Sequence, residues 1–153
     1  MSLNGHPREQ APYRALMDLV KVTGLLKKAG DHFFKPYGLT QSQFNVLMVL
    51  KHDAVKGCTQ SELSRRLLVN RADMSGLVRR MAKRKLLDRD DTPGDERAWQ
   101  VSISTGGRAL LQKIEPTYYQ KVGRVMGVHT VAESRALSDL LGRTQEAMHK
   151  HAF

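Results

Sequence analysis

The sequence predicts a mainly helical fold of the α+β class that carries one small β-hairpin. Apolar residues recur every three or four positions along most of the 153-residue chain, as they do on the buried face of an amphipathic helix. Several of these stretches follow a Thr, Ser or Asn that is suited to cap a helix. One stretch, residues 88–104, instead ends in the apolar-polar alternation of a strand and has Pro93-Gly94 at its centre.

Two helices are predicted at the start of the chain. The first covers residues 12–34, and Pro36 and Gly38 follow it as breaking residues. The second begins at Thr40-Gln41-Ser42-Gln43, a capping box in which the Thr and Gln side chains each bind a free backbone N–H. It ends near His52, and residues 53–58 are predicted to form a loop.

Two short capped helices come next. Thr59-Gln60-Ser61-Glu62 is a second capping box and opens a helix that ends before Leu68-Val69-Asn70. Asn70 is a good N-cap for a helix over residues 71–85. Two such helices separated by a turn of three or four residues are typical of a helix-turn-helix.

The last third of the chain is predicted to be helical. Ser104 caps a helix that Pro116 should kink or interrupt, since proline removes a helical hydrogen bond. A third capping box, Thr130-Val131-Ala132-Glu133, begins the final helix.

Composition limits the class of partner. The formal net charge of +10 favours a polyanion, with nucleic acid ahead of an anionic membrane surface, although a merely soluble basic protein has the same balance. The single Cys58 excludes an intramolecular disulfide framework and fits a reducing cytosol. No apolar run has the length of a membrane span and no secretory signal is visible, so a cytoplasmic protein is expected.

The helix over residues 71–85 has the composition of a DNA-recognition helix. One face is apolar, and the other carries the candidate DNA contacts, which are Arg71, Ala72, Asp73, Ser75, Gly76, Arg79, Arg80 and Lys83. Arg71 and Ser75 near the helix start are placed to contact base edges in the major groove. Arg79, Arg80 and Lys83 are better suited to phosphates, which add affinity without sequence information. The alternative is a solvated basic helix face.

Asp73 is an acid where DNA phosphates would be close. It either accepts a hydrogen bond from cytosine N4 or assists the helix start, and we favour the helix start because negative charge is stabilising there.

The hairpin of residues 88–104 follows the predicted recognition helix directly, and we call it the wing. Its tip is placed to lie against an adjacent minor groove, whose negative potential attracts arginine. We assign Arg97 to the groove and Arg89 to the DNA backbone, with the Asp95 carboxylate orienting an arginine. The alternative is a disordered acidic loop that avoids DNA.

Three runs together resemble the MarR family of winged helix-turn-helix transcription regulators. They are GLTQSQFNVLMVL at residues 38–50, TQSELSRRLLVNRADMSGLVRRMAKRKLLDRD at 59–90 and DERAWQVSISTGGRALL at 95–111. The family's wing has an aspartate, any residue, an arginine, a strand, a Leu-Thr pair and then a glycine. In this chain the matching residues are Asp95, Arg97, Ile103, Ser104 and Gly107, so isoleucine and serine replace leucine and threonine.

The resemblance implies a two-fold dimer that binds a pseudo-palindromic promoter site in double-stranded DNA. It places a helix for dimerisation in residues 1–36, the winged helix-turn-helix in 37–106 and further dimerisation helices in 107–153. The expected interface residues are Leu16, Leu137, Leu140 and Leu141, for which the alternative is packing within the chain's own core.

Many members of this family lose DNA affinity when a small aromatic or phenolic acid binds. Our guess for the residues that line such an effector pocket is Tyr13, His32, Phe33, Arg65 and Tyr118. Repression is the family's commoner mode of regulation and is adopted as the expectation.

Other chemistry has little support in the sequence. It contains no phosphate-binding glycine loop and no Gly-x-Ser-x-Gly, so neither an enzyme nor a cofactor is expected. Its six histidines include no i, i+4 pair that would indicate a metal site. A helix start such as the one after Cys58 can lower the pKa of a thiol, yet no resolving cysteine and no clear basic partner is evident, so thiol sensing is not expected. The competing function is a basic architectural protein that binds DNA without sequence preference or effector.

Overall fold

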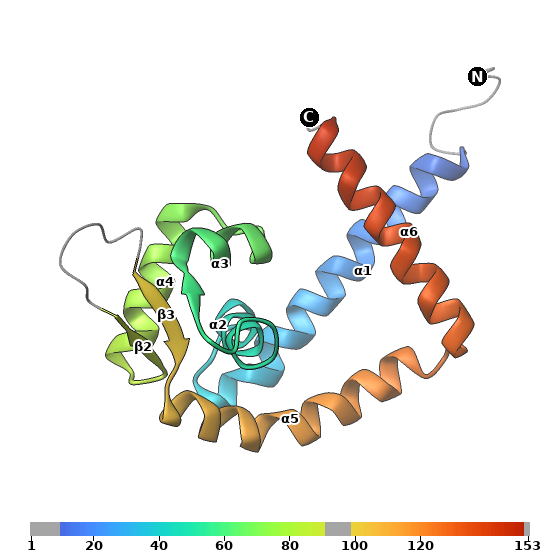
Figure 1. The fold of residues 1–153 in the computed structure, drawn as a ribbon. Helices are drawn as coiled ribbons and strands as arrows, with labels where there is room; N and C mark the ends of the chain where they lie inside the picture. Colours follow the sequence, from blue (N-terminus) through green and yellow to red (C-terminus); the bar gives the residue numbers. More distant parts are fainter. Residues whose placement is uncertain (1–9, 91–98, 152–153) are drawn as a thin grey trace. The chain divides into compact units, whose positions relative to one another are not determined.

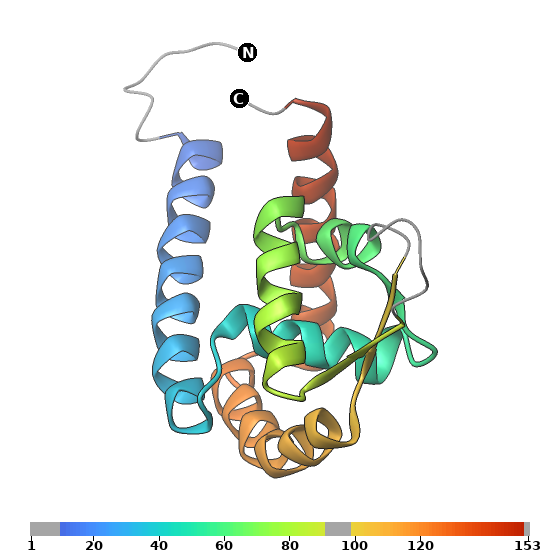
Figure 2. The same cartoon turned by 90° about the vertical axis from the view of Figure 1, so that its left-hand side faces the viewer.

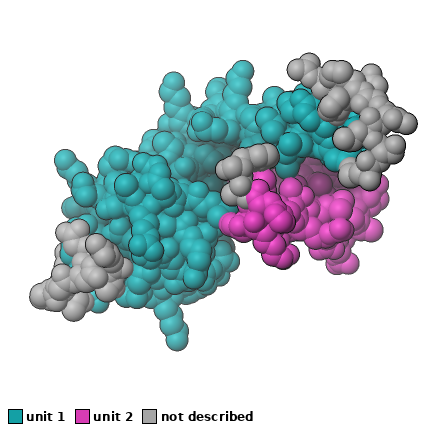
Figure 3. All heavy atoms as spheres, turned by 90° about the horizontal axis from the view of Figure 1, so that it is seen from above, with its two compact units in different colours: residues 1–111 teal, residues 112–153 magenta. Residues whose placement is uncertain are grey.

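The computed structural model describes residues 10–90 and 99–151 and divides the chain into two compact units, residues 1–111 and 112–153 (Figure 3). The elements along the chain are α1 (Ala11–Phe34), η2 (Lys35–Tyr37), α2 (Gln41–Met48), η3 (Val49–Asp53), β1 (Cys58–Thr59), α3 (Gln60–Leu67), α4 (Arg71–Lys83), β2 (Leu87–Arg89), β3 (Gln100–Ile103), α5 (Thr105–Met126) and α6 (Val131–Lys150) (Figure 1). The prediction of a mainly helical chain with a small β-hairpin is confirmed, since β2 and β3 pair antiparallel.

The core of the first unit lies where the end of α1 meets α2, α3, α4 and the sheet. The ring of Phe34 stacks on that of Phe44, with 4.2 Å between their centroids, and both side chains are buried. Leu63 of α3 and Val101 of β3 are fully buried as well. Each such side chain contributes roughly 1.5–3 kcal/mol to folding, which is enough to hold short helices that would not form alone.

Within the described residues the sheet has three strands in the order β1-β3-β2, and both pairings are antiparallel. Leu87 pairs with Ile103, and Cys58 pairs with Val101. The sequence predicted only the two-stranded hairpin and assigned residues 53–58 to a loop. That expectation is wrong for Cys58, because β1 contains two residues and shows no alternation that a sequence pattern could reveal.

Two of the three predicted capping boxes are complete. The Thr40 hydroxyl accepts from the Gln43 N–H at 3.2 Å, and the Gln43 side chain accepts from the Thr40 N–H at 3.0 Å. Thr130 and Glu133 form the same pair of bonds at the start of α6.

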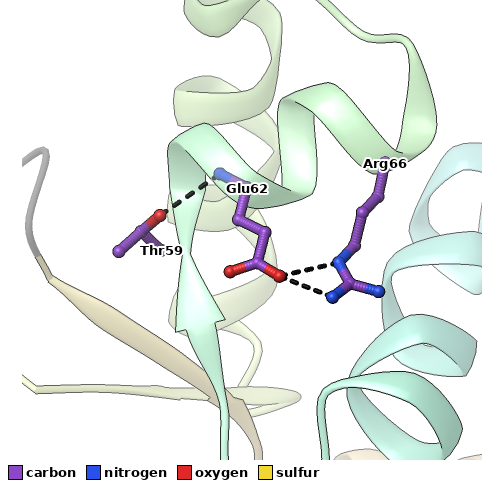
Figure 4. Close-up of polar contacts among 3 residues, drawn as sticks. All are labelled: Thr59, Glu62 and Arg66. Atoms are coloured by element: carbon purple, nitrogen blue, oxygen red, sulfur yellow. Dashed lines mark hydrogen bonds and ion pairs between the residues drawn. The ribbon is translucent and has the colours of Figure 1, made fainter.

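The predicted box at Thr59 is only half formed (Figure 4). The Thr59 hydroxyl accepts from the Glu62 N–H at 3.2 Å, as predicted. The Glu62 carboxylate instead accepts two bonds from the Arg66 guanidinium, at 2.9 and 2.5 Å. An i, i+4 ion pair with a two-donor guanidinium has displaced the reciprocal cap.

Two predicted helix ends are also settled by the structure. The second helix does run to the neighbourhood of His52, since α2 continues into the π-helical turn η3, closed by the Ala54 N–H donating to the Val49 carbonyl at 2.8 Å. Pro116 lies inside α5, which is one helix from Thr105 to Met126, so the proline does not interrupt it.

Candidate nucleic-acid interface

Helices α3 and α4 form a helix-turn-helix whose turn is fixed by the backbone. Leu68 ends α3 in the left-handed conformation, with φ of 54°, and its N–H donates to the Ser64 carbonyl. The Val69 N–H donates to the same carbonyl at 3.1 Å. Asn70 then returns to an extended conformation and begins α4. The turn between α3 and α4 therefore takes three residues, as the sequence predicted.

The start of α4 is held by a reciprocal cap. The Asn70 side-chain oxygen accepts from the Asp73 N–H at 2.8 Å, and the Asn70 amide donates to the Asp73 carboxylate. Asp73 thus assists the helix start, which supports our preferred explanation of this acid over a contact with cytosine.

The two faces of α4 are arranged as the sequence predicted. Met74, Leu77, Val78 and Met81 are buried. The opposite face is solvent-exposed at Arg71, Ala72, Asp73, Arg79, Arg80 and Lys83, and partly exposed at Ser75 and Gly76. Small residues beside arginines give a helix face that DNA can approach closely.

The C-terminal end of α4 is attached to two other parts of the first unit. The Arg84 guanidinium donates to the Gly38 carbonyl at 2.6 Å, across 46 positions of sequence. The buried Ser104 hydroxyl donates to the Lys85 carbonyl at 2.7 Å and accepts from the Gly107 N–H at 3.0 Å. These bonds fix the end of the recognition helix to the loop before α2 and to the start of α5. The sequence had given Ser104 only the capping role and Arg84 no role, because the carbonyls they bind are distant in sequence.

The base of the wing is formed by the end of β2 and the start of β3, and β2 leads to it from the C-terminal end of α4 (Figure 1, Figure 2). The Asp90 N–H donates to the Gln100 carbonyl at 2.9 Å and extends the pairing past β2. The Arg89 guanidinium carbon lies 5.1 Å from the centre of the Trp99 ring. Asp95 and Arg97, which we predicted for the wing tip, lie outside the described residues.

The residues guessed for an effector pocket are dispersed. Tyr13 and His32 are both exposed on α1 and are 19 positions apart, which is about 28 Å along a helix. One small molecule cannot contact both in a single chain. Phe33 packs edge-on against Phe34 at 4.9 Å, while Arg65 is exposed on α3.

Tyr118 belongs to the second unit and is half-buried beside Tyr119, with 5.6 Å between ring centroids. Burial raises the pKa of its phenol, and the neighbouring Tyr119 raises it further.

Cys58 is buried at the start of β1. Burial raises the pKa of its thiol, and Glu62 raises it further, while Arg66 acts in the opposite direction. The pKa is therefore raised, not lowered as a helix start alone would favour, because burial and Glu62 both disfavour the thiolate.

The leucines predicted for a dimer interface are all exposed in the single chain. The exposed fractions are 40% for Leu16, 38% for Leu137, 56% for Leu140 and 42% for Leu141. Across residues 10–90 and 99–151, no helix is long and apolar enough to cross a membrane. The same residues contain no group of three or more His, Cys, Asp or Glu that would hold a metal ion.

A capped helix-turn-helix followed directly by a small antiparallel sheet defines a winged helix-turn-helix DNA-binding protein. The sequence profile described as the MarR family matches residues 37–98, which include α2, α3, α4 and β2. The HTH-type transcriptional repressor YetL of Bacillus subtilis is 25% identical over 126 residues, which are 82% of this chain and 75% of YetL. The chain belongs to the MarR family and is a DNA-binding transcriptional regulator.

Solved structures have the same fold over nearly the whole chain. AbsC, a MarR family regulator from Streptomyces coelicolor, superposes with a TM-score of 0.81 at 19% identity and covers 98% of this chain and 100% of its own. MepR of S. aureus, in a complex with DNA, has a TM-score of 0.75 at 17% identity and covers 94% and 99%. Bordetella bronchiseptica BpsR, described as regulated in DNA binding by 6-hydroxynicotinic acid, has a TM-score of 0.73 at 25% identity and covers 92% and 96%.

Proposed function

We propose that the protein is a sequence-specific repressor that binds a pseudo-palindromic promoter site as a homodimer and releases it when a small aromatic or phenolic acid binds. The observation that carries the proposal is the exposed face of α4. It has Arg71 and Ser75 in its first two turns and Arg79, Arg80 and Lys83 further along. In recognition helices, residues near the helix start commonly contact base edges, and cations further along bind phosphates. The exposed residues of α4 are arranged in this order.

The homodimer is supported by apolar surface that the single chain leaves uncovered. Leu16, Leu25 and Leu26 are exposed on α1, and Leu137, Leu140 and Leu141 are exposed on α6. Large apolar side chains gathered on helices are typical of surfaces that bind another chain. A two-fold dimer covers the same apolar residues on both copies at once and presents two α4 helices to two half-sites.

Effector control is supported by the BpsR relationship and by aromatic residues near the end of α1. Phe33 is half-buried between Phe34 and Tyr37, with 5.9 Å between the ring centroids of Phe33 and Tyr37. A ligand that binds there would lower DNA affinity by favouring a conformation in which the two recognition helices do not match the half-sites.

The decisive experiment selects duplexes from a randomised library and then compares the selected site with a scrambled duplex over a series of salt concentrations. We expect the selected site to bind at least a thousandfold more tightly at physiological salt and to show two-fold symmetry. Equal affinities with parallel salt slopes would instead establish the basic architectural protein.

A further inference from the structure

Arg89 and Trp99 share one face of the sheet at the base of the wing. Arg89 pairs with Val101 across β2 and β3, and Val101 is fully buried, so this pair points toward the core. Trp99 precedes Val101 by two positions, and its ring meets Arg89 on the same side, with 5.1 Å from guanidinium carbon to ring centre. The side chains of Arg89 and Trp99 are both half-buried. On the same face of the sheet, Leu87 and Ile103 are buried in the core.

Stacking on an indole restrains a guanidinium while leaving its chemistry intact. Arginine stacks with its flat face, whereas its N–H donors point outward in the plane of the group. An arginine held in this way loses less side-chain freedom when a phosphate arrives than one on a free stem does. The indole of Trp99 is therefore suited to hold the Arg89 guanidinium in an orientation that can bind a phosphate.

The surroundings of Arg89 indicate which polyanion it contacts. Lys83, Arg84 and Lys85 are exposed at the end of α4, and β2 begins two residues later. Arg89 follows these three cations by four positions and lies between the exposed carboxylates of Asp88 and Asp90. The DNA backbone is the polyanion to which α4 is directed in a protein of this family.

We propose that Trp99 is a positioning residue that stacks on Arg89 and holds its guanidinium against a DNA phosphate at the base of the wing. This inference rests on DNA binding but needs neither an operator nor an effector. The competing role is structural only, with Trp99 closing the edge of the core and Arg89 remaining outside the complex.

The test measures the salt dependence of binding to a random-sequence duplex for wild type and for R89Q, W99L and W99F. If each protomer makes one contact through Arg89, R89Q lowers affinity about 8-fold per contact at 0.1 M salt and lowers the log–log salt slope by about 0.9 per contact. We expect W99L to reproduce most of this loss and W99F, which keeps an aromatic face, to stay near wild type. The double variant R89Q/W99L should bind no more weakly than R89Q, because the indole acts through the guanidinium.

Trp99 is the only tryptophan in the chain, so its emission gives a second readout in folded protein. We expect the duplex to change Trp99 emission with the same midpoint as binding measured by anisotropy, and R89Q to reduce that change. A W99L variant that is less stable but keeps the wild-type slope would overturn the proposal and establish the structural role. If W99L does not fold, an unchanged slope in R89Q overturns it equally. A wild-type protein that shows no site preference refutes the proposed repressor, while the slopes on random DNA still decide the role of Trp99.

Discussion

Arg79 provides the sharpest quantitative test of how α4 meets DNA. It is exposed on the face opposite Leu77, Val78 and Met81, and its replacement removes no buried contact. Arg79→Gln keeps a long polar side chain of high helix propensity and deletes one positive charge. The free energy of unfolding should therefore change by less than about 0.5 kcal/mol, as for most surface substitutions.

The expected loss of DNA affinity follows from counterion release. Each phosphate contact contributes about −0.9 to the slope of log K against log salt, so at 0.1 M its removal lowers affinity about 8-fold. The proposed dimer would lose two contacts, which lowers DNA affinity about 60-fold, or about 2.4 kcal/mol, and makes the salt slope smaller by about 1.8. The loss should be the same on the selected site and on a scrambled duplex, because a phosphate carries no base information.

Fluorescence anisotropy at four or five salt concentrations measures both quantities. Lys150→Gln at the end of α6 is the matched control, since it removes the same charge from an exposed position outside the winged helix. The DNA affinity of Lys150→Gln and the salt dependence of its binding should stay near the wild-type values. A phosphate contact through Arg79 is refuted if Arg79→Gln keeps the wild-type salt slope, or if its loss of affinity equals that of Lys150→Gln and so reflects net charge alone.

Four further predictions concern stability and reactivity. Gly107→Ala should destabilise the fold by about 1–3 kcal/mol in urea unfolding, because the added Cβ would lie 2.2 Å from the Leu86 carbonyl oxygen. Gly123→Ala in the same helix is the control, since its Cβ meets no atom within 4 Å and should stabilise the fold by about 0.5–1 kcal/mol. Ser104→Ala should cost about 1–3 kcal/mol and Ser104→Thr little, since only alanine removes the bonds to Lys85 and Gly107. The bonds from Thr130 lower the pKa of Glu133, so the stability that its carboxylate adds is complete above about pH 4.5 and is lost as the pH falls through the lower folded pKa. The variant E133Q caps the helix without titrating, so the difference in unfolding free energy between wild type and E133Q should shrink in acid. Cys58 should react with a thiol reagent more slowly in native than in urea-unfolded protein, because its raised pKa and burial both hinder attack, and equal rates would contradict the burial.

Local patterns were the reliable part of the sequence. The caps at Thr40, Asn70 and Thr130 need only neighbours within three positions, so their residue types determine them. The buried face of α4 follows from the spacing of its apolar residues in the same way. Glu62 shows the limit of this reasoning, because two partners within four positions compete for one carboxylate and the pattern does not rank them.

Contacts between distant residues were not predictable from these patterns. Strand β1 exists because residues 58–59 meet β3 more than forty positions later, and two residues show no periodicity of their own. The bond from Arg84 to Gly38 and the cation–π contact of Arg89 with Trp99 depend likewise on the assembled fold. The residue types at the candidate DNA interface could be identified from sequence, but the supports that orient them could not.

The supports around α4 explain how a short helix can be a precise reader of DNA. Asn70 fixes its first turn, four apolar side chains fix its inner face, and the Arg84 and Ser104 bonds fix its end. The thirteen residues of α4 span about 20 Å, so most of the helix lies close to one of its two fixed ends. Because β2 continues from that fixed end and pairs with β3, the base of the wing is oriented by the same bonds. The recognition helix and the base of the wing are therefore positioned by the same set of bonds, and we expect the proposed effector to move this surface as a whole rather than to reshape it.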